Sequence, residues 1–199
     1  MSAPTAPRTR TRRPASRARL VAFAGIVVVL AAALVLAIVL PSGGRGHASA
    51  AAVQRYEKAI LGPVKDWGSV EVLGMRPSVK DLLNPGNDTL PANAVATESK
   101  AWQAAFAHDR ALIAAVRPPT GLGRCRALML RALDKYVEAA RGFGQAAATP
   151  LEQRRPIVVT AVTAASDGDT LFDQASAVLQ RARLAAGLAA SPNFPNPQS

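Results

Sequence analysis

Cysteine and histidine are scarce in this sequence, and their scarcity limits the chemistry that it can carry. Cys125 is the only cysteine, so no disulfide can form within the chain and stability has to come from packing. The two histidines, His47 and His108, lie far apart, and with Cys125 they are too few for a zinc site, which needs several such ligands close together. We therefore expect neither a metal ion nor a cofactor.

Aromatic residues are also few, at 5% of the chain against 49% for all apolar residues. The apolar content is therefore mostly Ala, Leu and Val. Ala and Leu lose little side-chain entropy in a helix, whereas aromatic and β-branched residues dominate strands. The composition predicts an all-α protein.

Acidic residues are absent from the start of the chain, where residues 1–19 carry six arginines. This segment holds +6 of the formal net charge of +11 and leaves +5 for the rest. In the remainder, Lys and Arg alternate with Asp and Glu, as on a solvated helical surface. A nucleic-acid interface would instead cluster its positive charge on one recognisable module, so we expect no nucleic-acid partner.

One long uncharged run is present at residues 20–40, with the sequence LVAFAGIVVVLAAALVLAIVL. At 1.5 Å per residue, these 21 residues span roughly 30 Å, the thickness of the hydrocarbon core of a bilayer. Six arginines precede the run and only Arg45 follows it closely, so the positive-inside rule keeps the N-terminus in the cytoplasm. The pattern predicts a single transmembrane helix in the cytoplasmic membrane, with the rest of the chain outside.

A cleaved secretory signal is the alternative, because Ala48, Ser49 and Ala50 fit the small-residue pattern of a cleavage site. The chain would then be secreted. The apolar run is longer than the usual 7 to 15 residues of a signal peptide, which favours a retained anchor. Arg12 and Arg13 match a twin-arginine export signal weakly, because a proline follows them.

The segments around the run divide the chain into further parts. Residues 1–19 are rich in Pro, Ser, Thr and Arg, so we expect a disordered cytoplasmic tail that contacts anionic lipid headgroups. Residues 41–48 are expected to form a linker and 49–188 a helical extracytoplasmic domain. The proline-rich end, 189–199, is expected to be disordered.

Apolar residues that recur every three or four positions predict about four amphipathic helices in the exported domain. Their expected ranges are residues 53–70, 93–116, 122–143 and 149–186. Such helices with short connections form an antiparallel bundle, in which each helix buries one apolar stripe.

Glycine and proline set the expected breaks. Pro63 predicts a kink or break in the first helix, and the Pro- and Asn-rich residues 74–92 predict a long connection in which Ser78 caps one short turn. Gly142 and Gly144 are expected to end the third helix. After the fourth, a glycine at 187 followed by a leucine resembles a Schellman ending.

No group of residues predicts catalysis. Cys125 lies between two arginines that would lower a thiol pKa, but a buried core position is the preferred interpretation. His108 is its only conceivable imidazole partner and is expected at the surface beside Asp109. A carboxylate pair could form among Asp167, Asp169 and Asp173, of which Asp169 and Asp173 share a helix face at i, i+4, but such a pair more often faces solvent opposite a cation.

Two further features are interpreted as structural. Gly121 and Gly123 are too close together for a phosphate-binding fingerprint and indicate a turn between helices. The large aromatic side chains are expected to fill the core, and the alternative is that they line a ligand cavity. They are Trp67, Trp102, Phe106, Tyr136, Phe143 and Phe172.

A clear anchor without a catalytic constellation predicts an interaction or scaffold module of the bacterial cell envelope, with an envelope protein as its expected partner. The bacterial setting rests on composition, because Arg and Ala are abundant and Lys is rare. The alternative function is a small-ligand sensor or an enzyme that uses a cavity in the bundle.

Overall fold

The computed structural model describes residues 48–86 and 90–194, and within these residues every regular element is helical. In chain order they are α2 (Ala50–Ser69), the π-helix η1 (Val70–Met75), α3 (Arg76–Leu83), α4 (Ala92–Ala115), α5 (Gly123–Ala147) and α6 (Leu151–Ala185). The all-α prediction is confirmed for this part of the chain.

The structure does not test the membrane anchor. None of the described helices is both long enough and apolar enough to span a bilayer. The predicted tail at 1–19 and the apolar run at 20–40 lie outside the described residues, as does nearly all of the predicted linker at 41–48.

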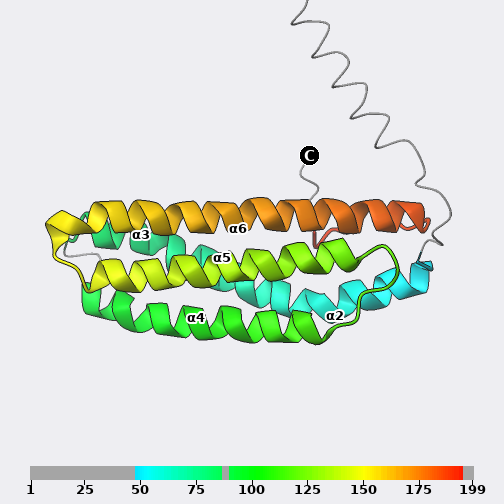
Figure 1. Cartoon of the computed structure of the whole chain (residues 1–199), viewed down its shortest axis with the longest axis horizontal. Coiled ribbons are helices and arrows are strands. Elements are labelled where there is room, and N and C mark those ends of the chain that lie inside the picture. Colours follow the sequence, from blue (N-terminus) through cyan, green and yellow to red (C-terminus); the bar gives the residue numbers. More distant parts are fainter. Residues whose placement is uncertain (1–47, 87–89, 195–199) are drawn as a thin grey trace, which may run out of the picture. The chain divides into compact units, whose positions relative to one another are not determined.

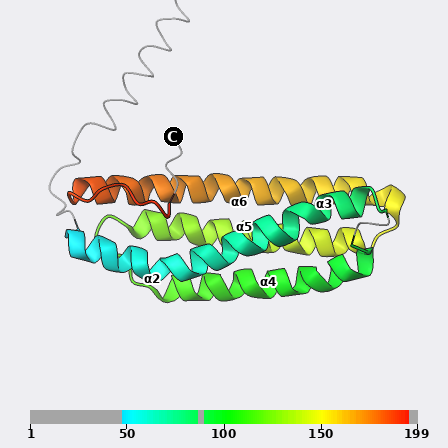
Figure 2. The same cartoon turned by 180° about the vertical axis from the view of Figure 1, so that it is seen from behind.

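Four helical rods run antiparallel to one another (Figures 1 and 2). The first rod consists of α2, η1 and α3, which follow one another without interruption, and α4, α5 and α6 form the other three. Helix α5 packs along both α4 and α6, while the first rod contacts α4 and α6. The predicted antiparallel bundle is confirmed.

The core lies along the inward stripe of α5. Its members, spaced three or four residues apart, are all buried: Cys125, Met129, Ala132, Tyr136, Ala139 and Phe143. Trp67 of α2 contacts Tyr136 with ring centroids 5.4 Å apart, and Phe106 of α4 stacks on the same ring at 5.4 Å. The aromatic side chains therefore join the first rod and α4 to α5, as the spacing of the apolar residues predicts.

The predicted connection at 74–92 is wrong in its first half, because residues 74–83 are helical. Pro77 is the second residue of α3 and directly follows the π-helix η1. Ser78 does not cap a turn; it is buried, and its hydroxyl donates to the carbonyl of Gly74 at 3.0 Å. The true connection is short and lies between α3 and α4.

The break expected at Pro63 is also absent, since α2 continues through this residue. Pro63 is buried on the inward side of the helix. A proline removes one backbone donor, but the surrounding apolar contacts of α2 hold the helix together across it.

Helix α5 runs past Gly142 and Gly144, where it was expected to end. Both glycines allow close approach of a neighbouring helix. A Cβ at Gly142 would lie 2.8 Å from the Cβ of Ala161 on α6, and one at Gly144 would lie 2.4 Å from the Oγ of Ser99 on α4. The glycines therefore mark packing between helices and not a helix end.

The C-terminal end of α6 matches its prediction. Gly187 has a φ of 74°, its amide donates to Leu184 at 3.0 Å, and the amide of Leu188 donates to Arg183 at 2.9 Å. This pair of hydrogen bonds is the Schellman motif. It reverses the chain and sends the following residues back along the bundle.

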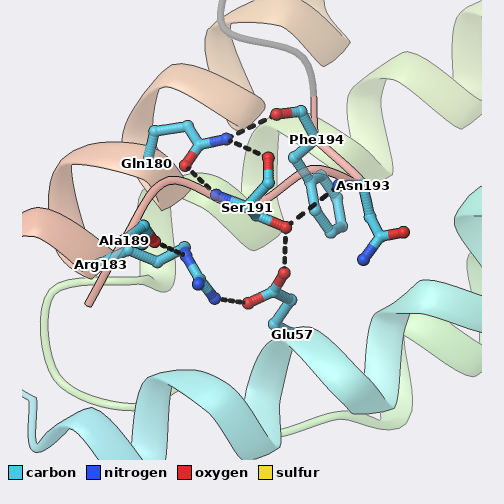
Figure 3. Close-up of polar contacts among 7 residues, drawn as sticks. All are labelled: Glu57, Gln180, Arg183, Ala189, Ser191, Asn193 and Phe194. Carbon is cyan, nitrogen blue, oxygen red and sulfur yellow. Dashed lines mark hydrogen bonds and ion pairs between the residues drawn. The ribbon is translucent and has the colours of Figure 1, made fainter.

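The residues after this turn are ordered through 194, so the disorder predicted for 189–199 is wrong over most of its length. We call residues 189–194 the C-terminal strap. Phe194 is fully buried, and Gln180 of α6 donates to the carbonyls of Ser191 and Phe194 at 3.0 and 2.5 Å (Figure 3). One phenylalanine and an amide side chain thus fix a segment whose composition is typical of disorder.

Candidate functional site

The π-helix η1 brings an acidic and a basic side chain onto one face. Residues five apart point roughly 140° away from each other on an α-helix, which has 3.6 residues per turn. In η1 the amide of Arg76 donates to the carbonyl of Glu71, which is the i to i+5 bond of a π-turn. The Arg76 Nε also donates to the Glu71 carboxylate, so the backbone irregularity directly creates this ion pair.

Asp169 of α6 joins this pair from the opposite rod. Its Oδ2 accepts from Nη2 of Arg76 at 2.9 Å, while its Oδ1 accepts from the hydroxyl of Tyr136 on α5. Gly168 makes room for the Tyr136 ring, because a Cβ at this position would lie 3.0 Å from the ring. Side chains from the first rod and from α5 therefore converge on Asp169 of α6.

A cleft of about 410 Å³ opens beside these groups, between the first rod and α6. We call it the π-helix cleft. Its charged end is formed by Glu71, Arg76 and Asp169. Apolar side chains make up most of the remaining lining, together with one serine: Met75, Val79, Phe143, Val162, Ala165 and Ser166.

Two groups at or beside the charged end of the cleft, Glu71 and Tyr136, have raised pKa values. Burial raises the pKa of the Glu71 carboxyl, the nearby Asp169 raises it further, and the Arg76 guanidinium opposes both effects. Burial is also the main cause of the raised pKa of Tyr136, and its hydrogen bond to Asp169 adds to it. Tyr136 therefore stays protonated and serves as a fixed donor to Asp169.

A second polar cluster lies where the strap meets α2 and α6 (Figure 3). Glu57 accepts from Arg183 and from the hydroxyl of Ser191, one bond to each carboxylate oxygen. The Nε of Arg183 donates to the carbonyl of Ala189 at 2.8 Å. Because these groups use one another as partners and are largely buried, the cluster holds the strap in place and offers no binding site.

The structure keeps apart the residues considered for thiol chemistry. Cys125 is fully buried beside Tyr56, and burial raises the pKa of its thiol to about 12, so it lies in the core as expected. His108 is exposed on α4, and His47 lies outside the described residues. No group of three or more His, Cys, Asp and Glu side chains in the described ranges is able to hold a metal ion.

The acidic residues of α6 separate in the same way. Asp173 is exposed, and Asp169 takes part in the cleft instead of pairing with it. Asp167 faces Lys135 at 3.7 Å on the surface. Five of the six aromatic residues are buried in the core as predicted, and Phe172 is partly buried against it. Phe143 also lines the cleft.

Sequence reasoning missed Glu71 and Arg76, because the helical pattern was taken to end before Gly74. One signal was available. Glu71 is a single charge inside the apolar stretch from Val70 to Met75, and Arg76 follows it at the spacing of a π-turn.

Comparison with protein-family models, curated proteins and solved structures finds no match for this chain. The function has to be inferred from the π-helix cleft and from the pattern of the sequence.

Proposed function

We propose that this chain is a single-pass membrane protein of the bacterial cell envelope that acts as an interaction module, and that it contacts its partner through the π-helix cleft. The anchor is residues 20–40, with residues 1–19 in the cytoplasm against anionic lipid headgroups. The helical domain then lies outside the cytoplasm. Binding, without catalysis, is its role.

The cleft carries this proposal. Recognition sites combine a mostly apolar surface with a few polar groups that fix orientation, and the cleft has both. Its polar groups are held by contacts from η1, α5 and α6, so they are arranged before a partner arrives. Single-turn π-helices within α-helices also occur frequently at functional sites.

Photocrosslinking in membranes tests the proposal. The photoreactive residue p-benzoylphenylalanine is placed in the full chain at Val79, which lines the cleft, and in a control at Ala107, which is exposed on α4 away from it. We expect a discrete adduct from position 79 and none from position 107. Equal labelling at both positions, or no adduct at 79, would refute the cleft as the contact site.

The same membranes test the anchor. Mass measurement should find the intact chain in the membrane fraction, with residues 1–19 protected from external protease and the helical domain accessible. A soluble form that begins at Ala51 would instead identify the cleaved, secreted alternative.

The size of the cleft favours a second candidate, a small-ligand sensor. Small-molecule sites typically enclose about 300 to 1,000 Å³, and the cleft at about 410 Å³ is within that range. A thermal-shift screen of the full chain in detergent separates the two candidates, because only a ligand sensor is stabilised by a small molecule alone.

A further inference from the structure

The π-helix cleft has more negative than positive charge. Its charged lining residues are two carboxylates, Glu71 and Asp169, and one guanidinium, Arg76. With both carboxylates ionised, the formal charge of the lining is therefore −1. An occupant with a positive charge would complement this end of the cleft, whereas an anion would meet two carboxylates for one guanidinium.

Arg76 already shows how a cation binds there. Its guanidinium joins Glu71 through Nε and Asp169 through Nη2, the latter at 2.9 Å. The two carboxylates thus form a receptor for a planar cation with donors on adjacent nitrogens.

Arg76 is also placed where another cation can replace it. Its side chain is 57% exposed, whereas that of Glu71 is only 8% exposed. The pair of Arg76 with Asp169 has both side chains substantially exposed, at 57% and 35%, and such pairs contribute little net stability, while Arg76 has open solvent into which it can swing. The buried carboxylate of Glu71, in contrast, needs a positive partner whether or not Arg76 supplies it.

The apolar residues that line the cleft indicate the chemistry of the uncharged part of the ligand. Met75, Val79, Phe143 and Val162 lie in the same lining as the charged groups and provide an apolar surface. A polar inorganic cation would leave this surface unused.

We propose that the π-helix cleft binds a small amphiphilic organic cation, an alkylguanidinium ion. Glu71 and Asp169 hold the charged head in competition with Arg76, and the apolar wall holds the alkyl chain. This inference rests on the second candidate function, the small-ligand sensor, because it names the chemistry of the ligand that the cleft recognises.

Titration of the full chain in nonionic detergent with n-butylguanidinium tests the inference, with butanol and butyrate as the neutral and anionic probes. Chemical-shift changes in residues that line the cleft report binding. We expect saturable binding of n-butylguanidinium only, weakened by added salt because the contact is ionic.

Two variants locate the charge contacts. Asp169→Asn should weaken binding of n-butylguanidinium about tenfold or more, since it removes a charge-assisted hydrogen bond. Arg76→Met keeps an apolar stem, removes the competing cation and should tighten binding. The surface ion pair of Arg110 with Asp134 supplies matched controls, and neither Asp134→Asn nor Arg110→Met should change affinity.

Circular dichroism establishes that each variant is folded. Glu71 loses its partner in Arg76→Met. If this variant does not fold for that reason, the affinities of the three probes and of Asp169→Asn still test the inference. Equal binding of butanol or butyrate, or no loss in Asp169→Asn, would overturn the inference while leaving the cleft as a binding site. Failure of the proposed function would appear separately, as absence of the crosslink at position 79.

Discussion

Asp109 is a buried carboxyl group that forms no ion pair with another described residue. It lies on α4 with 2% of its surface exposed, and its Oδ2 has no hydrogen-bond partner among the described residues. Burial raises its pKa to about 6, with a further contribution from Asp66 and an opposing one from His108. The folded state therefore favours the protonated carboxyl more than the unfolded chain does.

The consequence is a pH-dependent loss of stability. Because the pKa is higher in the folded state, the favourable contribution of Asp109 is complete below about pH 4 and is lost as the pH rises to about 6. Asp109→Asn is neutral at every pH, so it should raise the free energy of unfolding at pH 7.5 by about 1 to 3 kcal/mol. Urea unfolding at pH 7.5 and pH 4 measures the difference, which should shrink at the lower pH.

Asp134→Asn is the control for this prediction, because Asp134 is an exposed carboxylate on α5. It should change stability by less than about 0.5 kcal/mol at both pH values, as surface substitutions usually do. A destabilised Asp109→Asn at pH 7.5 would show that the carboxylate has a stabilising partner.

At the scale of the helices, small residues determine how closely the rods approach. In Gly142→Ala the new Cβ would lie 2.8 Å from the Cβ of Ala161, and neither atom belongs to a flexible side chain. The overlap should cost about 1 to 3 kcal/mol, more than the roughly 0.5 to 1 kcal/mol that alanine gains over glycine within a helix. We expect a net fall in the melting temperature, measured by circular dichroism.

Gly68→Ala provides the matched comparison. This glycine is also helical, but no atom lies within 4 Å of its added Cβ. Only the helix-propensity gain applies, so the melting temperature should rise. A rise in both variants would mean that α5 and α6 separate at little cost.

Glycines also explain where the helices predicted from the sequence are correct and where they are not. The apolar stripes of α4, α5 and α6 place these helices correctly, because each stripe continues long enough to outweigh local weak points such as Gly168. The ends at Gly142 and at Gly74 were wrong, since glycine breaks a helix in solvent but is tolerated where another helix needs the space. The π-helix cleft depends on such a segment, so Glu71 and Arg76 were missed as well.

At the scale of the whole molecule, some contacts join residues close together in the sequence and others join residues far apart. Successive rods are joined by short connections, so α4, α5 and α6 meet residues close to them in sequence. Arg76 of the first rod meets Asp169 of α6 across 93 positions, and the strap reaches further: Ser191 bonds Glu57 across 134 positions, so this contact closes nearly the whole described chain. Contacts between successive rods are thus local, while those of the first rod with α6 and with the strap are not.

This difference has a kinetic consequence for the strap. Contacts between distant residues carry a large loop-closure entropy and form late in folding, after the rods have packed. Removing them should speed unfolding and leave the folding rate unchanged. Phe194→Ala should therefore raise only the unfolding arm of the chevron, whereas Phe143→Ala, within α5, should slow folding as well. The strap then governs the lifetime of the folded domain, while the rods govern how fast it forms.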